Sequence, residues 1–164
     1  MSYLLDTDVF IRAKNLHYGF EFCPAFWDWL IAANLKRRVF SIEKVCNELL
    51  EVEDELSTWA DSRTEEFFLP PNVVVLSALA KVSAWASSQS YTQSAINTFL
   101  QVADYYLVAQ ALADGHTVVT HEVPSASVRR IKIPDACIGL GIKCITPFEM
   151  LRRERVRFVL ATPR

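Results

Sequence analysis

The chain has 164 residues, a net charge of −2 and 51% hydrophobic residues, so it is long and apolar enough for one folded domain. The small negative charge excludes a protein that binds polyanions through its overall charge. Its four cysteines lack C-x-x-C spacing and the density of a disulfide-rich secreted scaffold. We find no apolar stretch of membrane-spanning length and no signal peptide, and we therefore expect a cytoplasmic protein with reduced thiols.

The first predicted element is a strand formed by the apolar run Tyr3-Leu4-Leu5, which ends abruptly at Asp6-Thr7-Asp8. A short apolar run stopped by turn-type residues is typical of a buried parallel strand. Ligands bind beyond the carboxyl ends of strands in open α/β sheets, which makes Asp6 a candidate functional residue. From this stretch alone, Asp6 fits equally well as a residue that caps the next turn or helix.

Helices separated by two short strands are predicted for the next eighty residues. The helices are expected at residues 9–14, 25–33, 42–50, 55–66 and 73–87, and the strands at residues 39–40 and 67–69. Pro24 begins the second of these helices, and we expect Ser41 and Asn72 to cap the third and the fifth.

Glu48 lies at the margin of an apolar stripe in the third helix. The stripe follows helical spacing and consists of Ile42, Val45, Cys46, Leu49 and Leu50. At the opposite margin, Glu43 is explained by its place in the first turn, where the helix dipole favours a negative charge. Glu48 has no such structural explanation, and its carboxylate can face the edge of the sheet.

The next predicted helix begins with Asn97 or Thr98 as its cap, runs to about Asp114 and stops at Gly115. One stripe of this helix contains Leu100, Asp104, Val108 and Ala111. Asp104 therefore interrupts an apolar face, where a carboxylate needs hydrogen bonds, a cation or a metal ion. A buried Asp satisfied by neighbouring hydroxyls or an Arg is the structural alternative.

Another buried parallel strand is predicted at residues 116–120, and it ends in His121-Glu122, which brings a further carboxylate to a strand end. Residues 124–134 are irregular and basic, with Arg129, Arg130 and Lys132. A last strand at residues 143–145 and a helix opened by a capping box at residues 146–149 complete the chain.

Strands that alternate with helices predict a three-layer α/β fold with a mostly parallel central sheet. In that fold four acids can meet at one edge of the sheet: Asp6, Glu48, Asp104 and Glu122. Four carboxylates without an interleaved Lys or Arg repel one another, and hard divalent cations, Mg²⁺ or Mn²⁺, remove that repulsion. Such ions support phosphodiester hydrolysis. The basic segments at residues 36–38, 129–132 and 152–157 are candidates for holding the flanking backbone, although each also fits a solvated surface.

The ordered pattern at residues 4–10, 45–49, 104–109 and 118–122 resembles the PIN-domain nucleases. It is most similar to the VapC-type toxins of bacterial toxin–antitoxin pairs, or to a little-characterised branch close to them. The resemblance implies a single PIN-like domain over residues 1–164. It also implies a metal-dependent endoribonuclease that cuts single-stranded or looped RNA, an antitoxin protein from an adjacent gene as partner, and a homodimer as one assembly to consider.

The resemblance assigns the metal-binding role to Asp6, Glu48, Asp104 and Glu122, and it implies that the hydroxyls of Thr7 and Thr120 support these acids. Two positions depart from the family pattern. Asp8 stands where Asn or Ser is common, and the fourth acid is Glu122, preceded by His121, where Asp is more frequent. We expect His121 to pack at the strand end, the alternative being contact with the scissile phosphate.

Two other functions remain open at this point. Asp6-Thr7-Asp8 meets the Asp-x-Asp signature of phosphatases of the haloacid dehalogenase kind, in which Asp6 is the nucleophile and Asp8 the acid/base. A non-catalytic binding module that keeps the fold and uses the acidic cleft for assembly is the second alternative.

Overall fold

The computed structural model describes residues 1–162 and contains a five-stranded parallel sheet with the strand order β3-β2-β1-β4-β5. The strands are β1 (Tyr3–Leu5), β2 (Val39–Ile42), β3 (Phe68–Leu69), β4 (Thr117–Val119) and β5 (Cys144–Ile145). In the centre, Leu4 of β1 lies opposite Phe40 on one side and Val118 on the other. The prediction of an α/β fold with a parallel central sheet is confirmed.

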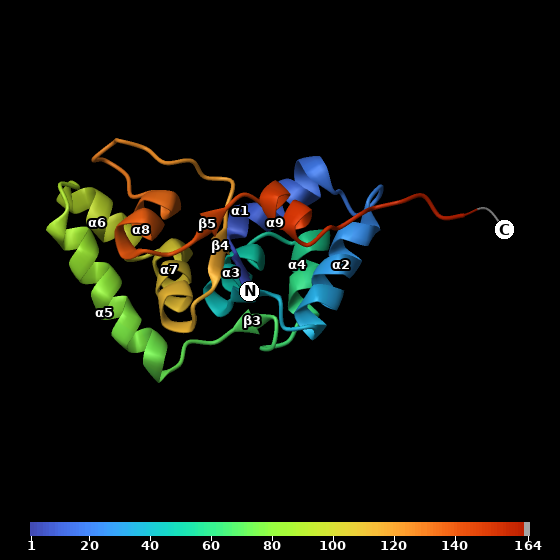
Figure 1. Cartoon of the computed structure of the whole chain (residues 1–164), viewed down its shortest axis with the longest axis horizontal. Coiled ribbons are helices and arrows are strands. Elements are labelled where there is room, and N and C mark those ends of the chain that lie inside the picture. Colours follow the sequence, from blue (N-terminus) through green and yellow to red (C-terminus); the bar gives the residue numbers. More distant parts are fainter. Residues whose placement is uncertain (163–164) are drawn as a thin grey trace.

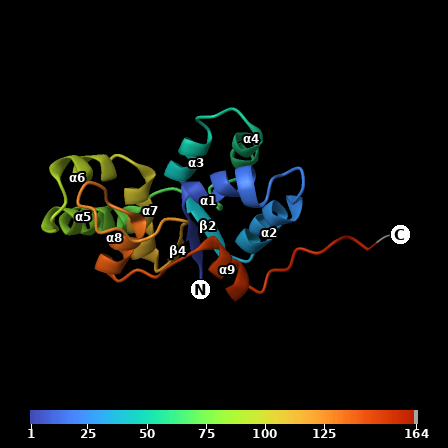
Figure 2. The same ribbon diagram turned by 90° about the horizontal axis from the view of Figure 1, so that it is seen from above.

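Helices cover both faces of this sheet (Figure 1). They are α1 (Thr7–Arg12), a π-helical turn (Ala13–His17), α2 (Pro24–Leu35), α3 (Glu43–Leu49), α4 (Glu55–Asp61), α5 (Val73–Ser88), α6 (Gln93–Phe99), α7 (Ala103–Asp114), α8 (Ile133–Leu140) and α9 (Pro147–Arg153). Helices α5 to α8 lie on one side, and α1, α2, α4 and α9 lie on the other, which the view from above in Figure 2 also shows. The arrangement has the three layers expected.

The two halves of the core differ in chemistry. On the side of α7, aliphatic residues such as Leu107 and Val108 are completely buried. On the side of α1 and α4, aromatic rings pack together, with the Phe10 ring centroid 5.9 Å from that of Trp59 and 6.3 Å from that of Phe67. Large rings remove much apolar surface from water, so this cluster fixes α1 firmly behind β1.

Several helix ends agree with the sequence. Asn72 caps α5 by accepting a hydrogen bond from the backbone N–H of Val75 (3.1 Å), and Thr146 caps α9 by accepting one from Glu149 (3.2 Å). Gly115 ends α7 at a φ of 74°, a left-handed conformation that glycine adopts without steric cost.

The expected role of Ser41 was wrong. Strand β2 extends through Ile42, so that Ser41 lies within the strand and its hydroxyl donates a hydrogen bond to the carbonyl oxygen of Leu5 (2.7 Å). A Ser41 cap would start the helix at Ile42, but α3 begins at Glu43, with Ile42 at the N-cap position. The completely buried Ser41 hydroxyl finds its acceptor on the neighbouring strand instead of on the helix.

The single helix expected from residue 97 or 98 to 114 is two helices. Thr92 caps α6, a short turn at residues 100–102 follows, and α7 begins at Ala103. The break leaves the N–H of Ala103 without a partner inside the helix, and the Glu48 carboxylate accepts its hydrogen bond at 3.3 Å. A contact between residues 55 positions apart therefore stabilises this helix start.

Other boundaries also differ from the predictions. The helix expected at residues 55–66 ends at Asp61, and α8 begins inside the segment expected to be irregular. Leu50 and Leu76, expected on buried stripes, are 40% and 60% exposed. Within residues 1–162, every helix is too short or too polar to cross a membrane.

These exposures give a direct stability prediction. Leu107→Ala should lower the free energy of unfolding by about 2–5 kcal/mol, because Leu107 is completely buried between α7 and the sheet. Leu76→Ala, on the exposed face of α5, should change it by less than about 0.5 kcal/mol. Urea denaturation of the three proteins measures the difference, and equal losses for both variants would contradict this packing.

Candidate active site

Asp6 occupies the centre of the carboxyl edge of the sheet. It directly follows β1, and its side chain is only 4% exposed. Although Asp6 stands at the N-cap position of α1, its side chain makes no capping hydrogen bond. Its Oδ2 instead accepts a hydrogen bond of 2.9 Å from the hydroxyl of Thr120, which follows β4. Asp6 therefore faces the end of the neighbouring strand, and helix capping does not account for it.

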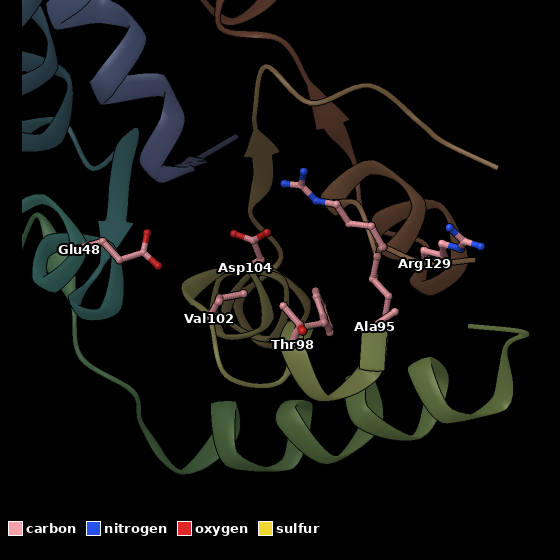
Figure 3. A pocket seen from close by; sticks show the side chains of 9 residues that line it. Glu48, Ala95, Thr98, Val102, Asp104 and Arg129 are labelled. Carbon is pink, nitrogen blue, oxygen red and sulfur yellow. The ribbon is translucent and has the colours of Figure 1, made fainter. Parts of the chain in front are cut away.

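Glu48 reaches the same edge from α3. Its Oε2 accepts a hydrogen bond of 2.6 Å from the Thr7 hydroxyl, and its Oε1 accepts one from the N–H of Ala103 at the start of α7. Glu48 thus connects the beginnings of two helices. Figure 3 shows its side chain extending from α3 toward Asp104 on α7.

Asp104 lies in the first turn of α7, and no side chain or backbone group elsewhere in residues 1–162 donates a hydrogen bond to its carboxylate. Burial is the main cause that raises its pKa to about 6, and the nearby charges of Glu122 and Glu48 raise it further. Burial also raises the pKa of Asp6 well above its usual range, with Asp104 as the next cause. These carboxylates therefore lie close enough to repel one another.

Glu122 is close to this group but already has two partners. Its Oε2 accepts a hydrogen bond of 2.8 Å from the N–H of Ile133, the first residue of α8, and its Oε1 lies 3.6 Å from Nη2 of Arg130. The Arg130 charge also lowers the pKa of Asp104, in opposition to the acids. The expectation of an acidic cluster without an interleaved Arg is therefore wrong, because the loop before α8 folds back over the site.

Asp8 and His121 flank the cluster. Asp8 forms an ion pair of 2.8 Å with Arg12, one turn along α1, and both side chains are partly exposed. The His121 ring packs near His17 and Phe148, at centroid distances of 5.5 and 5.6 Å. Burial is the main cause that lowers the pKa of His121. Packing at the strand end thus accounts for His121.

Only one of the three basic segments lies at this edge. The backbone N–H of Tyr3, at the beginning of β1, donates a hydrogen bond to the carbonyl oxygen of Arg38. The side chain of Arg38 forms an ion pair with Glu154. The segments at residues 36–38 and 152–157 therefore meet at the amino edge of the sheet, opposite the acids. The expectation that they flank a substrate at the carboxylates is wrong for this reason, whereas Arg129 and Arg130 line the same pocket as Asp104.

A pocket of about 400 Å³ opens next to Glu48 and Asp104. Its walls come from α6, the turn before α7 and the loop before α8, and the lining residues are Glu48, Ala95, Thr98, Phe99, Val102, Asp104, Arg129, Arg130 and Ile131. In Figure 3, Glu48 and Arg129 lie at opposite sides of this pocket, with Thr98 and Val102 close to Asp104.

The donors at this site are carboxylate oxygens, which suit Mg²⁺ or Mn²⁺. Within residues 1–162, no three Asp, Glu, His or Cys side chains already stand close enough to form a complete metal site. The residues nevertheless fit a divalent cation, since the Asp104 carboxylate has only its own backbone N–H as a hydrogen-bond donor and positive charge would relieve its repulsion from the other acids. Asp6, Glu48, Asp104 and Glu122 are the residues that could hold it.

In a comparison with protein families, the model for a domain of unknown function, DUF4411, matches residues 3–158. The chain belongs to the DUF4411 family. Comparison with curated proteins and with solved structures gives no match.

Some residues at the site of this DUF4411 domain were not found from the sequence. Thr98 and Phe99 line the pocket only because the chain breaks between α6 and α7, and the hydrophobic pattern runs through that break without a signal. The basic loop containing Arg130 was visible in the sequence, but its ion pair with Glu122 depends on how that loop folds back.

The raised pKa of Asp104 predicts how stability depends on pH. The free energy that a raised acid pKa contributes is fully present below the unfolded value, 3.8, and is lost as the pH rises through the folded value, about 6. In EDTA, Asp104→Asn should therefore be more stable than the wild type at about pH 7.5, by about 1–3 kcal/mol, and equally stable near about pH 4.

Urea denaturation at both pH values measures this difference. Asp28→Asn, an exposed substitution on α2, is the matched control and should follow the wild type at each pH. A wild type that is more stable than Asp104→Asn at about pH 7.5 would show that the carboxylate is not under electrostatic strain.

Proposed function

We propose that this DUF4411 domain is a metal-dependent endoribonuclease of the PIN type, which hydrolyses RNA phosphodiester bonds at the carboxyl edge of its sheet. Asp6, Glu48, Asp104 and Glu122 would hold Mg²⁺ or Mn²⁺. The order of these acids along the chain and their approach in the fold both support the proposal.

Asp104 is the observation that carries this proposal. Its carboxylate lies at the start of a helix, beside a pocket, without a hydrogen-bond donor from elsewhere in the described residues, and two other acids raise its pKa. Burial and repulsion make such an arrangement costly to the fold, whereas binding of a cation uses it directly. An Asp kept in that state is typical of a functional site.

The chain's own residues orient the acids and the substrate. The hydroxyls of Thr7 and Thr120 fix the Glu48 and Asp6 carboxylates by hydrogen bonds of 2.6 and 2.9 Å, so their remaining lone pairs keep a fixed direction. A bound divalent cation would supply a hydroxide nucleophile at neutral pH and neutralise negative charge on the phosphodiester. Arg129 and Arg130 are placed to bind a phosphate beside the acids.

The phosphatase alternative requires Asp8 as a free acid or base near the Asp6 carboxylate. The 2.8 Å ion pair between Asp8 and Arg12 directs the Asp8 side chain along α1 and occupies its carboxylate. The binding-module alternative uses the same acidic cleft for assembly, but it gives no role to the hydroxyls of Thr7 and Thr120 that fix the Glu48 and Asp6 carboxylates. Both alternatives are less well supported than the nuclease.

The purified protein should cleave a labelled RNA in Mn²⁺, and EDTA should stop the reaction. Asp6→Asn, Glu48→Gln and Asp104→Asn should each lower the rate at least about 100-fold, because each removes a ligand charge. Gel electrophoresis of a 5′-labelled single-stranded RNA measures the rate and the position of cleavage.

Two variants serve as controls in this assay. Glu43→Gln lies on the same helix as Glu48 but is exposed, and it should retain the wild-type rate. Asp8→Asn should also remain largely active, whereas a phosphatase of the haloacid dehalogenase kind would lose all activity. RNA cleavage that survives both Asp6→Asn and Asp104→Asn would contradict the proposed site.

We further propose that the domain acts as the toxin of a toxin–antitoxin pair. Strong expression of the wild type should then arrest bacterial growth, expression of Asp104→Asn should not, and the product of the adjacent gene should relieve the arrest. Growth curves measure the arrest and its relief, and gel electrophoresis of the soluble fraction checks that each protein is expressed and soluble. Normal growth with active, soluble wild-type protein would exclude the toxin role and leave the nuclease intact.

A further inference from the structure

The pocket beside Asp104 has a composition unlike that of the carboxylate cluster. Three of its lining residues, Ala95, Phe99 and Ile131, are apolar and buried, with exposures of 4%, 3% and 4%. Its volume of about 400 Å³ lies within the range of pockets that bind small ligands. Binding of a metal ion does not require these apolar walls, so they call for another explanation.

The charged groups of the pocket are two acids and two arginines. Glu48 lies at one side and Arg129 at the other, with Asp104 between them, and Arg130 also lines the pocket. Among the described lining residues, Thr98 is the one neutral side chain that can form a hydrogen bond. An occupant therefore needs apolar faces, a neighbouring anionic group that suits the arginines, and few specific hydrogen bonds.

Those three properties together describe one nucleotide of an RNA strand. Its base has two apolar faces that suit apolar walls, and its phosphate carries the anionic charge. A phosphate bound near Asp104 by Arg129 or Arg130 would then belong either to the nucleotide whose base occupies the pocket or to the next nucleotide.

We infer that this pocket is a subsite for an unpaired nucleobase next to the scissile phosphate. The inference rests on the proposed nuclease function, because it places the reacting phosphate at Asp6 and Asp104. A base within a duplex is stacked and paired, so it cannot enter a pocket that surrounds its faces. With Thr98 as the neutral hydrogen-bonding side chain, the subsite accepts different bases with little discrimination.

Binding of two RNA octamers tests the subsite without cleavage. One octamer has a mixed sequence that does not pair with itself, and the other has the same phosphates but abasic riboses. In Ca²⁺, fluorescence anisotropy should show that the wild type binds the octamer with bases about 10-fold more tightly than the abasic one. A duplex of the same sequence should bind no more tightly than the abasic strand.

Variants that fill the pocket should remove this preference. Thr98→Trp places a large ring in the pocket, and both octamers should then bind within about twofold of each other. Val102→Trp is a second variant that fills the pocket, for the case in which Thr98→Trp disturbs α6. Val102 lies outside α6 and is 36% exposed. Asn97→Trp, on the same helix but outside the lining, is the matched control and should keep the wild-type preference.

The outcomes separate the subsite from the catalytic proposal. A wild type that binds both octamers equally, or not at all, would overturn the subsite, as would an unchanged preference in folded Thr98→Trp and Val102→Trp. RNA that is bound with this preference but remains intact in Mn²⁺ supports the subsite and refutes the nuclease. RNA cleavage with no dependence on bases or on these variants supports the nuclease and refutes the subsite.

Discussion

The burial of the Asp6 carboxylate is the constraint on which the rest of the site depends. Strand β1 has neighbours on both sides, and the side chain that follows it is 4% exposed. A carboxylate in that place loses most of its hydration and is stable only with donors or a cation nearby. The Thr120 hydroxyl supplies one donor, yet the pKa of Asp6 is still raised well above its usual range.

Glu48 and Asp104 differ in how the fold accommodates their charges. Glu48 receives hydrogen bonds from the Thr7 hydroxyl and the Ala103 N–H, so its position is fixed by two separate helices. Asp104 has no such donor among residues 1–162, although its place in the first turn of α7 gives it a favourable interaction with the helix dipole. The first acid is thus held by two distant groups, whereas the second is held only by the backbone of its own helix.

Much of the fold could be predicted from the sequence, because local patterns determine it. The run Tyr3-Leu4-Leu5, the cap at Asn72 and the stop at Gly115 are each readable within a few residues. Asp6, Glu48, Asp104 and Glu122 were likewise visible as acids in unexpected places. Their approach in space needed the strand order as well, which puts β1 between β2 and β4.

Several features that could not be predicted depend on contacts that no local pattern records. The Ser41 hydroxyl bonds to β1, the break before Ala103 is stabilised by Glu48, and Arg130 reaches Glu122 through a folded loop. The helical spacing of apolar side chains continues through residues 100–102, where the helix breaks. This spacing carries no information on which backbone N–H groups have hydrogen-bond partners, so it does not reveal the break. The pocket, which that break creates, was therefore invisible.

The pairing of β1 with β4 also bears on how the protein folds. Tyr3 lies opposite Thr117, and the Asp6 side chain bonds to Thr120, 114 residues further along the chain. Closing a loop of that length has a large entropic cost before any of its contacts form, so parallel sheets of this kind fold slowly. On the ribosome, residues 1–116 therefore emerge without the partner that completes the central strand, and the acidic site assembles late in synthesis.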